Sequence, residues 1–191
     1  MSYAELYAFC QDLGPQVSRK YFYPKVLALI GANQIRHIRA TLDTQVTRGM
    51  YLSAQNTSAQ FVQQVGGRVI ITARGLNYCW ERFVFTKELM HAFDDPMQAT
   101  DSGDEFDTQL QEITRPSGGK VSPQTTAEFT AFWMALGILC PEKHRLIYAE
   151  KLVAKQIDEY AIALELRIPE LYVPLLFEPR YQPILHQLGV A

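Results

Sequence analysis

The sequence predicts a single α+β domain over residues 1–191, with N-terminal helices, a small β-sheet, a helix that carries a polar motif, and a C-terminal helical region. A chain of 191 residues that is 48% hydrophobic and 12% aromatic can fill one sizeable core. Apolar residues recur at helical intervals near both ends, whereas short runs rich in β-branched and aromatic residues lie between them. These observations favour helices that flank a small central sheet.

The chain is expected to open with two helices. Ser2 and Glu5 have the spacing of a capping box, and apolar residues follow at helical intervals until Gly14-Pro15 ends the first helix. A second helical region is predicted from Pro24 to about Leu42, with an interruption near Gly31.

Strands are predicted next, at Gly49–Ala54 and Gly67–Ala73, because both runs are rich in strand-forming residues and bounded by turn formers. The run YCWERFVF, residues 78–85, is expected to supply a third strand or its approach. A helix over Thr86–Asp94 follows in this interpretation.

Residues 95–124 are polar, acidic and rich in Gly, Pro and Ser, which predicts a long loop with room for one short helix. Further helices are expected over 126–139 and roughly 142–166, with a short one after Pro169.

Two features of the sequence indicate the cellular location of the protein. The N-terminus carries an acidic residue where a signal peptide needs basic ones, and the most apolar run, AFWMALGILC, is about half of the ~20 residues that span a bilayer. We therefore expect a cytoplasmic protein with no membrane contact.

One short stretch carries recognisable chemistry. Residues 87–91, Lys-Glu-Leu-Met-His, differ at one position from H-E-x-x-H, the helical motif in which two histidines bind zinc and the glutamate acts as general base. On a helix, Lys87 and His91 share a face with Glu88 beside them. Alone, such a histidine is more often a core residue than a metal ligand.

A second stretch strengthens the first. Downstream lies EFTAFWMALGILCP, which begins at Glu128 and ends at Pro141. Together, from about Gly49 to Leu176, the chain resembles the ImmA/IrrE family of zinc endopeptidases. That family has Arg, Phe and Thr ahead of H-E-x-x-H and, after a gap, E-x-x-A-x-x-F-A-x-x-L-L-x-P. The resemblance implies a zincin-like core.

By this resemblance, Glu88 matches the general base, His91 the second zinc ligand, and Glu128 the third, acidic ligand. Lys87 takes the place of the first histidine. Phe132 stands where the family often has Asn, and Met134 where it often has Phe. The core positions of the motif thus survive better than the catalytic ones.

The exchange at position 87 disfavours zinc, because an ammonium has no lone pair and would repel a cation. We expect Lys87 to fill the volume of the metal and to neutralise Glu88 and Glu128 in a salt-bridge cluster. The interpretation is a pseudopeptidase without a cofactor, which binds a protein, such as a helix-turn-helix repressor, in phage, mobile-element or stress regulation.

Two alternatives stay open. In the first, Asp94 or Asp95 supplies an oxygen ligand beside His91 and Glu128, which gives an active endopeptidase with zinc or another divalent metal. In the second, residues 159–179 form a helix-turn-helix that binds DNA. Nucleic acid is the less favoured partner, because no Lys or Arg lies between Arg167 and Arg180.

Overall fold

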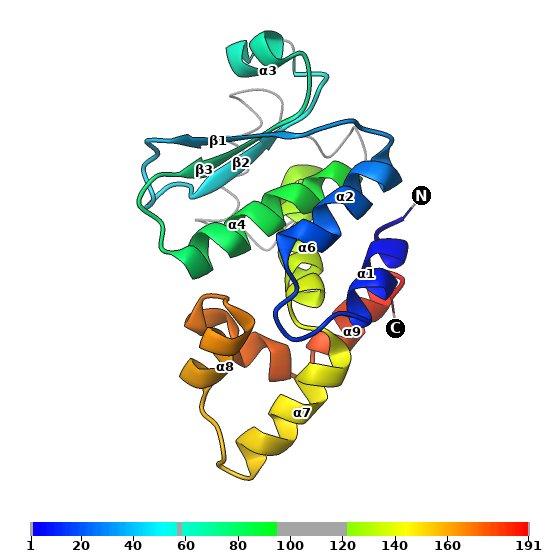
Figure 1. The fold of residues 1–191 in the computed structure, drawn as a ribbon, viewed down its shortest axis with the longest axis vertical. Helices are drawn as coiled ribbons and strands as arrows, with labels where there is room; N and C mark the ends of the chain where they lie inside the picture. The colour runs from blue at the N-terminus through cyan, green and yellow to red at the C-terminus, as the bar shows by residue number, and fades with distance from the viewer. Residues whose placement is uncertain (1, 57–58, 95–121, 191) are drawn as a thin grey trace.

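The computed structural model describes residues 2–56, 59–94 and 122–190 (Figure 1). The chain forms an α+β fold in which a small sheet is covered by helices on both faces. Helix α3 (Gln60–Val65) lies on one face, and α4 (Tyr78–Met90) crosses the other. This confirms the predicted fold class.

The first predicted helix is confirmed as α1 (Tyr3–Gln11), which begins with the expected capping box of Ser2 and Glu5. The second prediction is wrong in its boundaries. Helix α2 spans Arg19–Ile30, starts at the Ser18 cap, contains Pro24 and ends at Gly31 in the left-handed conformation. Residues 36–40 then form strand β1 (Arg36–Ala40), not helix.

The sheet has the order β1-β3-β2. Strand β3 (Val69–Ala73) pairs in parallel with β1 and antiparallel with β2 (Gly49–Leu52), so both strands predicted here are confirmed. All five residues of β3 are buried, because α3 covers one face of this central strand and α4 covers the other. The third strand is thus β1, and residues 78–85 are helical.

Helix α4 replaces the strand-then-helix arrangement predicted for residues 78–94. The Asn77 side chain accepts a hydrogen bond from the Trp80 backbone N–H at 3.0 Å and caps the helix eight residues earlier than expected. The helix ends at Met90, and residues His91–Phe93 continue as the 3-10 turn η1. Because α4 packs between the sheet and α6, buried residues occupy most of its circumference and hide the helical period.

The C-terminal region is helical as predicted, with different boundaries. Helix α6 (Pro123–Leu139) starts three residues early at the Ser122 cap, and the rest of the predicted loop up to residue 121 lies outside the described residues. The single helix predicted over 142–166 is two helices, α7 (Glu142–Val153) and α8 (Glu159–Leu166). After Pro169, only 3-10 turns form, η3 (Glu170–Tyr172) and η4 (Pro174–Phe177), before α9 (Tyr181–Gln187).

One core joins these helices beneath the sheet. It takes buried residues from α1, α2, α4, α6 and the C-terminal helices, while a smaller cluster under α3 is centred on Val62, Val69 and Ile71. None of the helices in the described ranges has both the length and the apolar character of a membrane span.

Arg82, on α4, ties three distant segments together. Its guanidinium donates hydrogen bonds to the carbonyls of Leu166 (2.7 Å), Arg167 (3.2 Å) and Val17 (2.6 Å). Burial lowers the pKa of Arg82 to about 10, which leaves it charged at neutral pH. The side chain therefore fixes α4 against the end of α8 and the segment before α2.

Replacing Arg82 by Ala should destabilise the fold by about 3 kcal/mol, because the part-buried carbonyls of Leu166 and Val17 lose a charged donor. Urea unfolding followed by circular dichroism measures this change. Arg36→Ala, at an exposed arginine on β1, is the control and should change the free energy of unfolding by less than about 0.5 kcal/mol. Equal effects of the two substitutions would contradict the role assigned to Arg82.

Candidate functional site

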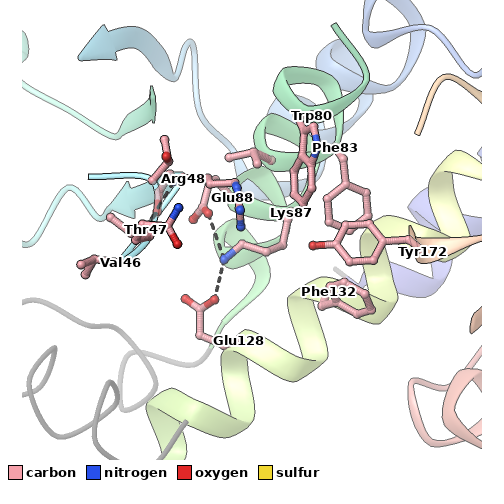
Figure 2. A pocket seen from close by; sticks show the side chains of 14 residues that line it. Val46, Thr47, Arg48, Trp80, Phe83, Lys87, Glu88, Glu128, Phe132 and Tyr172 are labelled. Atoms are coloured by element: carbon pink, nitrogen blue, oxygen red, sulfur yellow. Dashed lines mark hydrogen bonds and ion pairs between the residues drawn. The ribbon is translucent and has the colours of Figure 1, made fainter. Parts of the chain in front are cut away.

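A pocket of about 210 Å³ opens between the chain before β2, one side of α4, the first half of α6, and Tyr172 (Figure 2). Residues 44–49 form one wall, and Lys87, Glu88 and Glu128 lie at its floor. Three of the residues that the sequence singled out, Lys87, Glu88 and Glu128, therefore line one cavity, whereas His91 and Asp94 are not part of its lining.

Lys87 links the two carboxylates. Its Nζ lies 2.9 Å from Glu88 Oε1 on the same helix and 2.5 Å from Glu128 Oε2 on α6, as the dashed lines in Figure 2 show. Burial by itself would lower the pKa of Lys87, but the charges of Glu88 and Glu128 outweigh this effect and raise it above its ordinary value. The ammonium is thus charged at neutral pH, and the ion pairs expected with Glu88 and Glu128 are present.

Glu88 is the most deeply buried of these groups, with a side chain only 2% exposed. A Cβ atom at Gly49 would lie 2.5 Å from Val84 Cγ1 and 3.1 Å from Glu88 Cγ, so only glycine lets β2 begin this close to α4. Burial raises the pKa of Glu88, and the positive charge of Lys87 opposes that rise. The Glu88 carboxylate therefore depends on Lys87 for its charge balance.

His91 follows one turn further along. Its Nδ1 lies 2.6 Å from Asp94 Oδ2, and its Nε2 lies 3.2 Å from Glu128 Oε1. Burial would lower the pKa of His91, but the Asp94 hydrogen bond and the Glu128 carboxylate raise it to about 9. The imidazole is therefore protonated at neutral pH and faces a carboxylate on each side.

Glu128 lies between the two cations. Burial would raise the pKa of its carboxyl group, but Lys87 and then His91 together hold it well below the usual range. The cluster of Lys87, Glu88, His91, Asp94 and Glu128 thus pairs two cations with the carboxylates around them. Its members come from α4, the turn after it, and α6.

This arrangement does not fit a catalytic metal. Lys87 Nζ contacts the carboxylates that would bind the ion, and Glu128 Oε1 lies 3.2 Å from His91 Nε2, where the ion would bind the imidazole. Asp94 contacts Nδ1, so an ion on Nε2 would lie on the opposite side of the ring from it. In the described ranges, no group of three or more His, Cys, Asp or Glu side chains is arranged to hold a metal ion. Asp95 lies outside the described residues.

The pocket also has an aromatic wall that the sequence did not indicate as a site. Ring centroids lie 5.5 Å apart for Trp80 and Tyr172, 4.5 Å for Phe83 and Tyr172, and 5.0 Å for Phe132 and Tyr172. Helical spacing could have placed Phe83 beside Lys87, and Phe132 beside Glu128. No local signal could have brought Tyr172 to them.

The proposed helix-turn-helix lacks its second α-helix. Helix α8 ends at Leu166, the turn contains Ile168-Pro169 as expected, and a three-residue 3-10 turn, η3, follows where a recognition helix would start. Tyr172 of this turn packs on the aromatic wall of the pocket. The segment therefore packs against α4 and α6 through Tyr172.

Comparisons with known proteins identify no relative: no family model, curated protein or solved structure matches the chain.

Removing the central cation should destabilise the cluster. Lys87→Met leaves the buried Glu88 without its close cation and Glu128 with His91 alone, so we expect the free energy of unfolding at pH 7 to fall by about 3 kcal/mol. The double variant Lys87→Met/Glu128→Gln should be more stable than Lys87→Met alone, because it also removes one of the carboxylates that then outnumber the remaining cation, His91.

Urea unfolding at pH 7 gives both values. The control is Arg180→Met, which breaks the exposed Arg180–Glu178 pair and should cost less than about 1 kcal/mol. Strictly additive losses at positions 87 and 128 would show that the two residues are not coupled.

Stability should also depend on pH through His91. A folded-state pKa of about 9, raised from the ordinary 6.5, stabilises the fold fully below pH 6.5 and loses this contribution as the pH rises through 9. The loss is on the order of 3 kcal/mol. Unfolding free energies of the wild type and His91→Gln, measured from pH 6 to 10, should converge as the pH rises.

His186→Gln, at an exposed histidine on α9, serves as the control and should follow the wild-type curve. A His91→Gln curve parallel to the wild type over this range would exclude a charged His91.

Proposed function

We propose that the chain is a pseudopeptidase: a protein with a peptidase-like site that works without a metal ion and binds another protein in the pocket above Lys87. The single observation that carries this proposal is the position of the Lys87 ammonium, which contacts both Glu88 and Glu128. A cation that belongs to the chain itself thus balances the carboxylates that a metal would otherwise bind.

The relative placement of the motif residues supports a peptidase-like origin. Glu88 and His91 come from α4 and its end, and Glu128 faces them from α6, as the resemblance to the ImmA/IrrE peptidases implies for a general base and two ligands. In addition, the Nδ1 contact with Asp94 is the kind of contact that orients a metal-binding histidine. Lys87 is the residue in this constellation that is incompatible with such a centre.

The pocket supports a binding role. It combines an aromatic wall with Lys87, Glu88 and Glu128, which are paired with one another, so an apolar side chain can enter without separating these charges. A polypeptide is the ligand class that the resemblance favours. By analogy alone, the partner is a regulatory protein, such as a helix-turn-helix repressor, in phage, mobile-element or stress regulation in the cytoplasm.

An active metal-dependent endopeptidase is the competing outcome, and metal content separates it from the proposal. Wild-type protein, purified without chelator or metal-affinity resin, should contain well under 0.1 zinc per chain by mass spectrometry, because Lys87 repels the ion and His91 is protonated. Lys87→His restores a third donor and should raise zinc uptake towards about one per chain.

Two controls make this experiment decisive. Lys87→Gln removes the charge without adding a ligand and should stay metal-free. Lys87→His/Glu128→Gln should lose the zinc gained by the single variant. About one metal per wild-type chain would overturn the proposal and direct the search to substrates.

A further inference from the structure

Arg48 stands out among the charged residues around the pocket. Lys87, Glu88 and Glu128 are paired with one another, whereas no carboxylate in the described part of the chain lies within ion-pair distance of the exposed Arg48 guanidinium. Its Cζ instead lies 4.3 Å from the centroid of the Trp80 ring. A charged group on the lining of the pocket is thus held in place without an anion.

The aromatic contact prepares Arg48 for a ligand. Packing on Trp80 restricts the side chain and covers one face of the guanidinium, and its edge, which carries the N–H donors, remains for a planar acceptor. A carboxylate matches this edge because it accepts two parallel hydrogen bonds. Figure 2 shows Arg48 and Trp80 at one end of the aromatic wall.

Next to this guanidinium lies the aromatic wall of the pocket. Trp80, Phe83, Phe132 and Tyr172 form a continuous set of edge-on and tilted ring contacts. The volume of about 210 Å³ is smaller than the ~300–1,000 Å³ of pockets for drug-sized ligands and suits one large side chain. Burial raises the pKa of Tyr172, so its ring stays uncharged and adds no repulsion to an anion.

The acidic floor does not prevent an anion from binding. Lys87 contacts both Glu88 and Glu128, and a protonated His91 lies 3.2 Å from Glu128, so the carboxylates are screened from the pocket by adjacent cations. Among the described residues that line the pocket, the charged group without an ion pair is therefore Arg48.

We infer that the pocket binds a carboxylate attached to an aromatic or large apolar group, with the carboxylate on Arg48 and the apolar group against Trp80, Phe83, Phe132 and Tyr172. This inference rests on the proposed binding function and adds its ligand class. Two sources supply this chemistry: the C-terminal residue of a protein partner, and a free aromatic acid.

Fluorescence anisotropy with a fluorescein-labelled hexapeptide that ends in Leu-Phe tests the inference. The peptide with a free C-terminal carboxylate should bind at least about tenfold more tightly than its C-terminal amide, because the amide cannot accept the charged bidentate bonds. Competition by 3-phenylpropanoate distinguishes the two sources. If a concentration of this acid close to the Kd of the peptide displaces half of the bound peptide, the ligand is a free acid. If more than about tenfold that concentration is needed, the ligand is a peptide C-terminus.

Variants assign the effect to Arg48. Arg48→Gln should abolish the difference between acid and amide, and Arg48→Lys should retain only part of it, because lysine keeps the charge but not the planar fork. Arg36→Gln, at an exposed arginine on β1, is the matched control and should keep the full difference. Circular dichroism spectra confirm that each variant is folded.

Equal binding of acid and amide, an unchanged preference in Arg48→Gln, or binding of neither peptide would overturn the inference. If metal-free protein binds the acid and amide peptides equally, the proposed binding function stands, but without a preference for a carboxylate. Conversely, about one zinc per chain in the same preparation would remove the proposed function, whatever the peptides do.

Discussion

The buried contact between Lys87 and the carboxylates of Glu88 and Glu128 is the constraint on which the rest of the site depends. Taking three charges out of water costs several kcal/mol per ion, and their mutual attraction offsets this cost only when the geometry is good. Here one ammonium reaches carboxylates on two helices at 2.9 and 2.5 Å, and His91 approaches the second carboxylate from the other side. The spacing of α4 and α6 is thus coupled to the charge state of the cluster.

The same constraint shapes the pocket. Because Lys87 and His91 neutralise the floor, Glu88 and Glu128 can remain buried beside a wall of four aromatic rings. Arg48 then contributes a charge whose position is set by Trp80 and not by an acidic partner in the described residues. In a metal-dependent site, the ion would dominate the local electrostatics. In this chain, two side-chain cations lie at different depths: Lys87 pairs with Glu88 and Glu128, and the exposed Arg48 lies on the Trp80 ring.

Several elements could be predicted because their signals are local. The capping box identified α1, and the turn formers around two runs of strand-forming residues identified β2 and β3. Prediction failed where tertiary contacts override local pattern. Residues of α4 are buried against both the sheet and α6, which erases the helical period, and residues 36–40 join the sheet because β3 offers a parallel edge.

For the candidate site, the sequence by itself determined that Lys87 and Glu88 lie on one helix with His91 one turn further along, and that an acidic residue follows on a later helix. Helical geometry places residues three and four apart together, so these relations need no tertiary information. Only the tertiary structure decided that Glu128 faces Lys87 and His91 and that Asp94 contacts Nδ1 of His91. It also decided that Arg48 and Tyr172 complete the pocket. The reason is physical: desolvation and charge pairing depend on which distant segments exclude water from a group, and that is a property of the packed chain.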